Sequence, residues 1–186
     1  MYKHIPNILT IIRFLLVPVF LYYVIINEAA NHISIAFIVF VLASFTDYLD
    51  GMLARKYKVI SDFGKIMDPL ADKLLVLSAL GCISWLHPYY LPKLIFFIIL
   101  ARELLVTILR EIYQKKGIVL AADKLGKLKT VMQMAGIIFA YFCWAYLGTV
   151  SKAIITLVIA WFWLVVLITL ISGINYIKVL FYRRNP

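Results

Sequence analysis

Apolar residues along the chain gather into long stretches separated by short polar breaks. A helix needs roughly 20 residues to cross the apolar core of a bilayer, and six stretches are of about that length. They run over Ile8–Ile26, Ile33–Ala54, Pro69–Leu86, Pro92–Ile112, Leu128–Leu147 and Lys152–Leu180. The breaks carry turn and polar residues, among them Asn27-Glu28, His87-Pro88 and Gly148-Thr149. The pattern therefore predicts an all-α integral membrane protein with six transmembrane helices.

Composition supports the same fold class. Of the 186 residues, 65% are hydrophobic, whereas soluble domains are about half apolar. No linker-like segment or internal repeat divides the sequence, so we expect a single membrane domain over residues 1–186. The apolar run after Arg13 is not followed by a small-residue cleavage site, which favours a retained first helix over a removed signal peptide.

The basic residues are distributed unevenly between the two predicted membrane faces. With six spans, both termini lie on the same side as the second–third and fourth–fifth connections. That side carries Lys3, Arg55, Lys56, Lys58, Lys65, Lys115, Lys116, Lys124, Lys127, Lys129, Arg183 and Arg184. The opposite connections carry only Lys93 and Lys152. The positive-inside rule then places both termini in the cytoplasm. The net charge of +10 is assigned to contact with anionic lipid headgroups, and no nucleic-acid partner is expected.

Acidic residues cluster between Asp47 and Asp72, which hold five of the nine in the chain. An aspartate at the centre of a membrane helix costs about 2.5–3.5 kcal/mol on insertion scales. Such residues persist when they are paired, bind a cation or line a wet cavity. Asp47 and Asp50 share one helix face, and Asp68 and Asp72 lie on one stripe of the next helix. A helix cap or a snorkelling side chain is the alternative for any one of them.

The two predicted helices are antiparallel neighbours, so their four carboxylates are expected to meet at one depth near the cytoplasmic edge. Four negative charges repel strongly in a low dielectric, and divalent cations resolve that repulsion. Ligation by oxygen alone suits Mg²⁺, Mn²⁺ or Ca²⁺. Two such ions are suited to clamping a pyrophosphate and stabilising displacement at phosphorus.

The start of the third helix and the small residues beside the aspartates each allow two interpretations. Asp68-Pro69 has the form of a helix start with Asp68 as N-cap; alternatively, the helix begins near Ser61-Asp62 and Pro69 lies inside it. Gly51 and Ala54 follow Asp47 on one face and leave room for a flat group against the backbone. Close helix–helix packing explains the same small residues.

The segment from Asp47 to Asp72 reads DYLDGMLARKYKVISDFGKIMDPLAD, with the pattern D-x-x-D-G-x-x-A-R, eight residues, G-x-x-x-D-x-x-x-D. It resembles the signature of the CDP-alcohol phosphotransferase family, whose members are six-helix membrane proteins that commonly form homodimers. The resemblance implies transfer of a phosphatidyl group from CDP-diacylglycerol to an alcohol. It implies that Asp47, Asp50, Asp68 and Asp72 bind two Mg²⁺ or Mn²⁺ ions, with Asp72 also the general base. The implied nucleotide site is lined by Asp50, Gly51, Ala54, Arg55 and Gly64.

Two further strings resemble the phosphatidylglycerophosphate synthase branch of this family. One is PNILTIIR from Pro6 to Arg13, and the other is the A-R-E-L-x-V-T string from Ala101 to Thr107. Asn7 and Thr10 lie on the same helix face as Arg13 and are expected to contact the nucleotide or a metal-bound phosphate. The alternative is an N-cap followed by a snorkelling Arg13.

Basic residues in the fourth span and the following connection are candidates for binding the phosphate of the acceptor. They are Arg102, Arg110, Lys124, Lys127 and Lys129. Arg110 is the favoured candidate because it sits within the helix, and it shares a face with Glu103, a conceivable ion-pair partner. Ordinary cytoplasmic charge is the alternative for the lysines.

A phosphorylated acceptor needs such cations, whereas serine does not. With the resemblance, this favours sn-glycerol 3-phosphate as acceptor, with phosphatidylglycerol phosphate and CMP as products. The resemblance implies a bacterial cytoplasmic membrane and an active site that faces the cytoplasm. Inositol phosphate, serine and phosphatidylglycerol stay open as acceptors. A cation-coupled transporter is a remoter alternative, disfavoured because the chain shows no repeated half.

Overall fold

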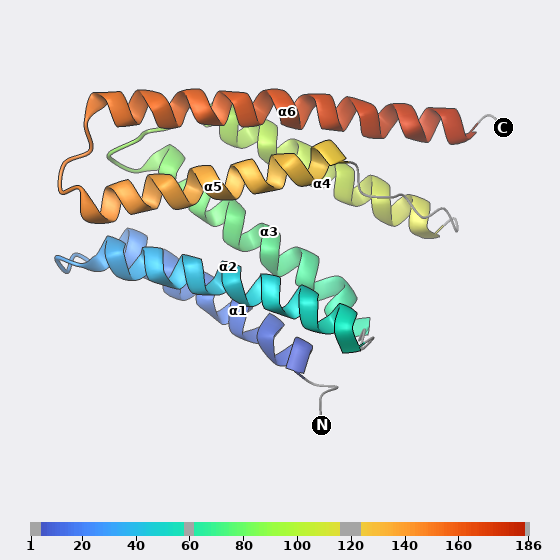
Figure 1. Ribbon diagram of the computed structural model, residues 1–186, viewed down its shortest axis with the longest axis horizontal. Helices are drawn as coiled ribbons and strands as arrows, with labels where there is room; N and C mark the ends of the chain where they lie inside the picture. The colour runs from blue at the N-terminus through green and yellow to red at the C-terminus, as the bar shows by residue number, and fades with distance from the viewer. Residues whose placement is uncertain (1–4, 58–61, 116–123, 185–186) are drawn as a thin grey trace. The chain divides into compact units, whose positions relative to one another are not determined.

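A computed structural model shows helices and no strands over the residues that it describes (Figure 1). Backbone is described for residues 5–57, 62–115 and 124–184, and side chains for 10–46, 70–71, 73–113 and 125–175. The elements are α1 (Ile5–Leu21), the π-helical segment η2 (Tyr22–Ile26), α2 (His32–Tyr57), α3 (Asp62–Trp85), α4 (Lys93–Lys115), α5 (Lys124–Tyr146) and α6 (Lys152–Arg184). Each predicted apolar stretch corresponds to one helix, with α1 and η2 together forming the first.

The largest difference from the predicted boundaries is at the start of α3. This helix begins at Asp62, so Pro69 lies inside it and the interpretation of Asp68 as an N-cap is wrong. A proline inside a helix removes one backbone hydrogen bond. Membrane proteins tolerate this because neighbouring groups can satisfy the carbonyl that is released.

Local hydrogen bonds and one glycine conformation mark the helix boundaries at the breaks that polar residues had indicated. Gly148, two residues after the end of α5, adopts φ 62°, a left-handed conformation that costs glycine little. The Ser151 hydroxyl accepts a 3.4 Å hydrogen bond from the Ile154 backbone N–H and caps α6. After η2, the Asn27 side-chain oxygen accepts from the Ala29 N–H at 2.8 Å, which forms a turn.

The chain forms two compact units, and the first comprises Met1–Cys82 with Ile138–Thr149. In this unit α1 and α2 lie side by side (Figure 1). Its core contains Phe20, Phe40 and Tyr141, all with no exposed surface. The ring centroid of Tyr141 lies 5.5 Å from that of Phe20 and 6.2 Å from that of Phe40. The Tyr141 hydroxyl donates to the Ala79 carbonyl at 3.2 Å. Four helices of the unit therefore meet at one aromatic cluster.

The second unit comprises Ile83–Ile137 with Val150–Pro186. Here α4 and α6 lie side by side (Figure 1), and Ile95 and Ile99 of α4 are fully buried. Trp161 of α6 donates its indole N–H to the Met132 carbonyl of α5 at 2.9 Å. The N-terminal half of α5 is thereby joined to α6.

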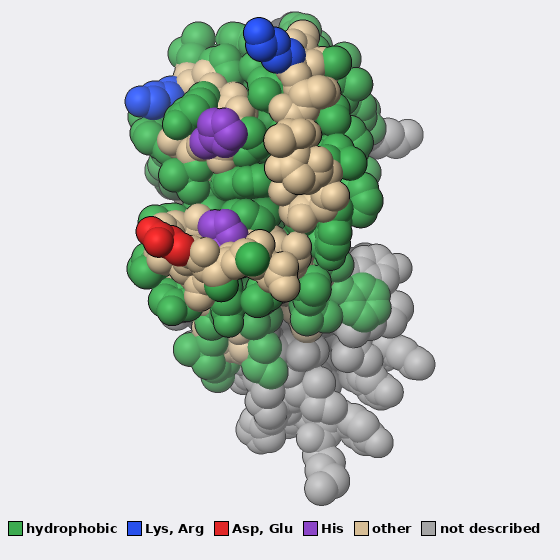
Figure 2. All heavy atoms as spheres, turned by 90° about the vertical axis from the view of Figure 1, so that its left-hand side faces the viewer, with side chains coloured by type: hydrophobic (Ala, Val, Ile, Leu, Met, Phe, Trp, Pro, Cys, Tyr) green, Lys and Arg blue, Asp and Glu red, His purple; other side chains and the backbone are tan. Residues whose placement is uncertain are grey.

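The described surface is strongly apolar. The face drawn in Figure 2 carries mostly hydrophobic side chains, with few charged ones. Large residues such as Leu15, Val131 and Leu167 are 60% exposed or more, which is typical of a surface that contacts lipid rather than water. Among the described residues, two helices are long and apolar enough to cross a membrane, Leu125–Tyr146 and Lys152–Asn175. Shorter apolar helices cover Thr10–Ile26, His32–Thr46 and Lys73–Trp85.

Candidate active site

The aspartate pattern falls on two successive helices. Asp47 and Asp50 belong to α2, and Asp68 and Asp72 belong to α3. Helical geometry gives each pair a common face, because residues three or four apart are neighbours on a helix surface. The side chains of these four residues lie outside the described residues, so their convergence and the two divalent cations stay predictions.

The predicted nucleotide contacts on α2 and α3 also stay predictions. Gly51, Ala54 and Arg55 belong to α2 and Gly64 to α3, and nothing beyond their helical backbone is described. Elsewhere, the residues with described side chains contain no group of three or more His, Cys, Asp or Glu that could hold a metal.

The predicted face of α1 points into the first unit. Thr10 is 1% exposed and Arg13 is fully buried, and each has an interaction partner. The alternative of a snorkelling Arg13 is therefore wrong. A guanidinium group is buried only where acceptors or carboxylates compensate its desolvation. Asn7 belongs to α1, and its side chain lies outside the described residues.

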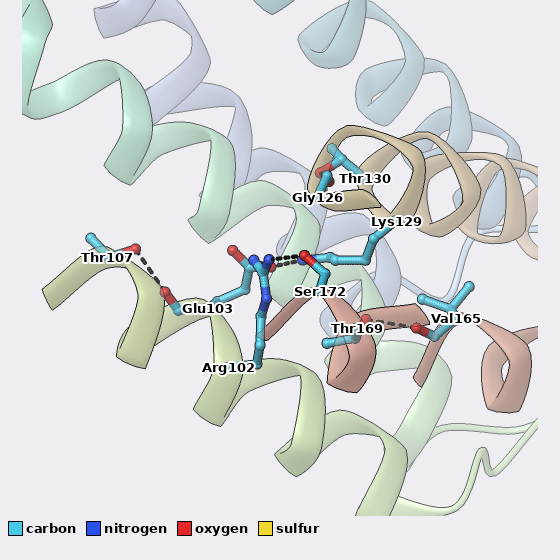
Figure 3. Close-up of polar contacts among 9 residues, drawn as sticks. All are labelled: Arg102, Glu103, Thr107, Gly126, Lys129, Thr130, Val165, Thr169 and Ser172. Carbon is cyan, nitrogen blue, oxygen red and sulfur yellow. Dashed lines mark hydrogen bonds and ion pairs between the residues drawn. The ribbon is translucent and has the colours of Figure 1, made fainter. Parts of the chain in front are cut away.

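A cluster of polar side chains joins α4, α5 and α6 in the second unit (Figure 3). Arg102 donates from Nη2 to the Ser172 hydroxyl at 2.8 Å. Its Nη1 lies 3.6 Å from Oε1 of Glu103. Lys129 forms an ion pair with the same Oε1. The side chain of Lys129 is only 3% exposed, so a charged pair is embedded among apolar helices.

Two glycines flank the Arg102 side chain. A Cβ added to Gly126 of α5 would lie 3.5 Å from the Ser172 hydroxyl oxygen and 3.6 Å from Arg102 Nη2. A Cβ added to Gly173 of α6 would lie 3.6 Å from Arg102 Cγ. The arginine side chain therefore passes two positions that carry no side chain.

Only part of the predicted set of acceptor-binding cations gathers in this cluster. Arg102 and Lys129 meet at Glu103. Arg110 is exposed and lies eight residues along α4 from Arg102, which is about 12 Å of helix. Lys127 is exposed as well, and the Lys124 side chain lies outside the described residues. Within the described structure, Glu103 pairs with Lys129 and Arg102 instead of the proposed Arg110.

Sequence reasoning missed Ser172, and for Glu103 it considered Arg110 as an ion-pair partner but not Lys129. A single serine in an apolar helix usually bonds to its own backbone, as Thr169 does to the Val165 carbonyl at 2.6 Å. The pairing of Glu103 with Lys129 joins residues 26 positions apart, which helix periodicity does not predict. The weak signal that was available is the rarity of a carboxylate inside an apolar span.

Comparisons with known proteins cover nearly the whole chain. The family model described as CDP-alcohol phosphatidyltransferase matches residues 3–171. A protein of Rickettsia typhi named CDP-diacylglycerol–glycerol-3-phosphate 3-phosphatidyltransferase is 37% identical over 181 residues, which cover 95% of this chain and 96% of the relative. A probable phosphatidylglycerophosphate synthase of Mycobacterium tuberculosis is 37% identical over 176 residues, covering 94% of this chain and 80% of the relative.

Proposed function

This chain belongs to the CDP-alcohol phosphatidyltransferase family, and we propose that it transfers the phosphatidyl group of CDP-diacylglycerol to sn-glycerol 3-phosphate. The products are phosphatidylglycerol phosphate and CMP. The observation that carries the proposal is the similarity to relatives named for this reaction, which extends over 95% of the chain. The family resemblance of the Asp47–Asp72 segment is confirmed by the family match.

In the proposed mechanism, Asp47, Asp50, Asp68 and Asp72 hold two divalent cations, Mg²⁺ or Mn²⁺. Their fit rests on the donor set, since carboxylate oxygens on two successive helices suit hard cations. When bound, these cations would neutralise the charge of the pyrophosphate and of the departing CMP.

The chain itself binds the nucleotide and moves one proton. Gly51, Ala54 and Gly64 leave backbone accessible to the cytidine diphosphate, and Asn7, Thr10, Asp50 and Arg55 complete that site. Asp72 takes the proton from the attacking hydroxyl of glycerol 3-phosphate. The hydroxyl oxygen then forms a bond to the lipid-side phosphorus, and the bond from that phosphorus to the CMP oxygen breaks. A carboxylate is a weak base for an alcohol, so positioning supplies most of the rate.

We assign the acceptor phosphate to Arg102 and Lys129, with Arg110, Lys124 and Lys127 as further cations. Guanidinium and ammonium groups are strong donors to phosphate oxygens. This assignment is supported by the contacts that bring Arg102 and Lys129 to one carboxylate. An inositol phosphate would use the same chemistry, so competition between acceptors in the assay separates the two substrates.

The enzyme is proposed to lie in a bacterial cytoplasmic membrane with six transmembrane helices, as a homodimer. Both termini and the active site would then face the cytoplasm. The apolar exposed surface supports contact with lipid, and the relatives named above come from bacteria.

The decisive experiment measures CMP release from CDP-diacylglycerol with glycerol 3-phosphate, with and without Mg²⁺. We expect wild-type activity only when the metal is present. Asp72→Asn should lose at least about a hundredfold in rate, a typical contribution of a general base. Glu28→Gln is the control, because Glu28 is exposed between η2 and α2 and should leave the rate unchanged. Equal activity of wild type and Asp72→Asn, or activity in EDTA, would contradict the mechanism.

A further inference from the structure

We propose that Glu103 and Ser172 are positioning residues for the acceptor: Glu103 fixes Lys129, and Ser172 fixes Arg102, at the site of the glycerol 3-phosphate phosphate group. This inference rests on the proposed function. A phosphate site is expected to carry positive charge, and the proposal explains why the negatively charged Glu103 lies there.

The cluster places ionisable side chains where burial is energetically costly. Glu103 is 16% exposed and Lys129 is 3% exposed at their side chains, and both lie between apolar helices. Ionisable residues inside membrane helices are costly and mark functional positions more often than structural ones. Apolar residues of similar volume would hold the helices at least as well, so helix packing alone does not account for the charges.

Each of the two cations is held by a side chain of the cluster. A lysine side chain has four rotatable carbon bonds and no planar group to orient it. The ion pair with Glu103 Oε1 restricts the Lys129 ammonium to one location. Arg102 is restricted twice, by its hydrogen bond to Ser172 at 2.8 Å and by Glu103 Oε1 at 3.6 Å. The two cations are therefore pre-ordered, which lowers the entropy that substrate binding must remove.

Three helices contribute side chains to the cluster. Arg102 and Glu103 lie on α4, Lys129 on α5 and Ser172 on α6 (Figure 3). The positions of the two cations thus depend on three helices at once. Gly126 and Gly173 lie beside the Arg102 side chain and place no side chain of their own against it. Loss of either holding residue should loosen a cation without removing it.

The test uses purified full-length enzyme and steady-state kinetics with each substrate varied in turn. Glu103→Gln and Ser172→Ala should each raise the KM for glycerol 3-phosphate, the former by about ten- to a hundredfold, as expected when a hydrogen bond to a charged group is lost. The KM for CDP-diacylglycerol should stay within about twofold in both variants. Glu103→Asp and Ser172→Thr keep the carboxylate and the hydroxyl, and they should recover part of the loss.

Matched controls lie on the same helices. Glu111→Gln makes the same change at an exposed position of α4. Thr169→Val removes a hydroxyl of α6 that bonds to its own helix. Both controls should leave the acceptor KM unchanged. Thermal unfolding in detergent is measured for every variant, and Ser172→Ala keeps the test valid if Glu103→Gln does not fold.

The outcomes separate the positioning proposal from the function on which it rests. A wild-type enzyme that releases no CMP with glycerol 3-phosphate overturns both. An active wild type whose variants keep the acceptor KM, or raise both KM values equally, overturns the positioning alone. A lower acceptor KM in Glu103→Gln also overturns it, since Glu103 would then act as a charge that competes with the phosphate.

Discussion

Gly136 of α5 has no side chain, which lets Trp161 and Phe162 of α6 approach the α5 backbone closely. A Cβ built at this position would lie 2.7 Å from Cδ1 and 2.8 Å from Nε1 of Trp161, and 3.2 Å from Cζ of Phe162. The first two distances are too short for carbon to occupy without movement. Trp161 is also held by its hydrogen bond to the Met132 carbonyl one turn earlier, so its ring cannot move freely.

We therefore predict that Gly136→Ala destabilises the protein. Overpacking of this kind costs about 1–3 kcal/mol, which exceeds the roughly 1 kcal/mol that alanine gains over glycine in a helix. The melting temperature in detergent should fall by several degrees. Gly126→Ala, on the same helix, is the matched control because its Cβ meets its nearest atoms at 3.5 Å or more. Equal melting temperatures for the two variants would contradict the prediction.

Single residues also show how far the sequence predicted the candidate site. Arg102 was a candidate because charges are rare in apolar spans, and Lys129 because it belongs to a lysine cluster of the kind that binds phosphate. Ser172 was missed because its bond to Arg102 spans 70 positions of sequence. Arg110 was favoured for its place in the helix, yet it is exposed and lies about 12 Å of helix away from Arg102. Composition and spacing select residue types well, but side-chain partners depend on packing between helices.

At the scale of elements, apolar length predicted all six helices but not which face of each is buried. A helix in lipid is apolar on its outer face too, so the 3.6-residue period that marks a buried face in soluble proteins is weak. In α2, Phe40 is fully buried whereas Phe45 is 56% exposed. The start of α3 was ambiguous for a similar reason, since proline both opens helices and is tolerated inside membrane helices.

Phe40 and Phe45 of α2 provide a test at this scale. Phe40→Ala should leave a cavity beside Phe20 and Tyr141, and comparable changes in protein cores cost about 3–5 kcal/mol. Phe45→Ala, an identical change on the same helix, should have little effect because an exposed side chain leaves no cavity inside the protein when it is shortened. Thermal unfolding in detergent measures both. A loss of similar size in the two variants would mean that the buried face has been assigned wrongly.

At the scale of the whole molecule, the reaction and the fold class were the most predictable properties. The spacing of the Asp47–Asp72 segment led to the family, and the family match over residues 3–171 confirmed it. The single domain, the homodimer and the metals stay predictions. A dimer interface within lipid is as apolar as the lipid-facing surface, so composition does not mark it. Membrane sidedness, by contrast, can be predicted from composition, because lysine and arginine are enriched in cytoplasmic connections.

The predicted sidedness rests on the asymmetry of lysine and arginine, and cysteine labelling tests it. Cys82 and Cys143 are free and buried, so replacing both with alanine gives a suitable background. New cysteines are placed at Tyr90, between α3 and α4, at Ser151, between α5 and α6, and at Lys127, near the start of α5; all three positions are exposed.

In intact cells, a membrane-impermeant maleimide should label Tyr90→Cys and Ser151→Cys, because the positive-inside rule puts the connections poor in lysine and arginine outside. Lys127→Cys should react only after the membrane is permeabilised. Labelling of Lys127→Cys in intact cells, together with protection of the other two, would invert the topology. An inverted protein would present its basic residues, and the proposed site, to the side opposite from the cytoplasm. Charge distribution would then no longer support a cytoplasmic active site, although the family assignment would stand.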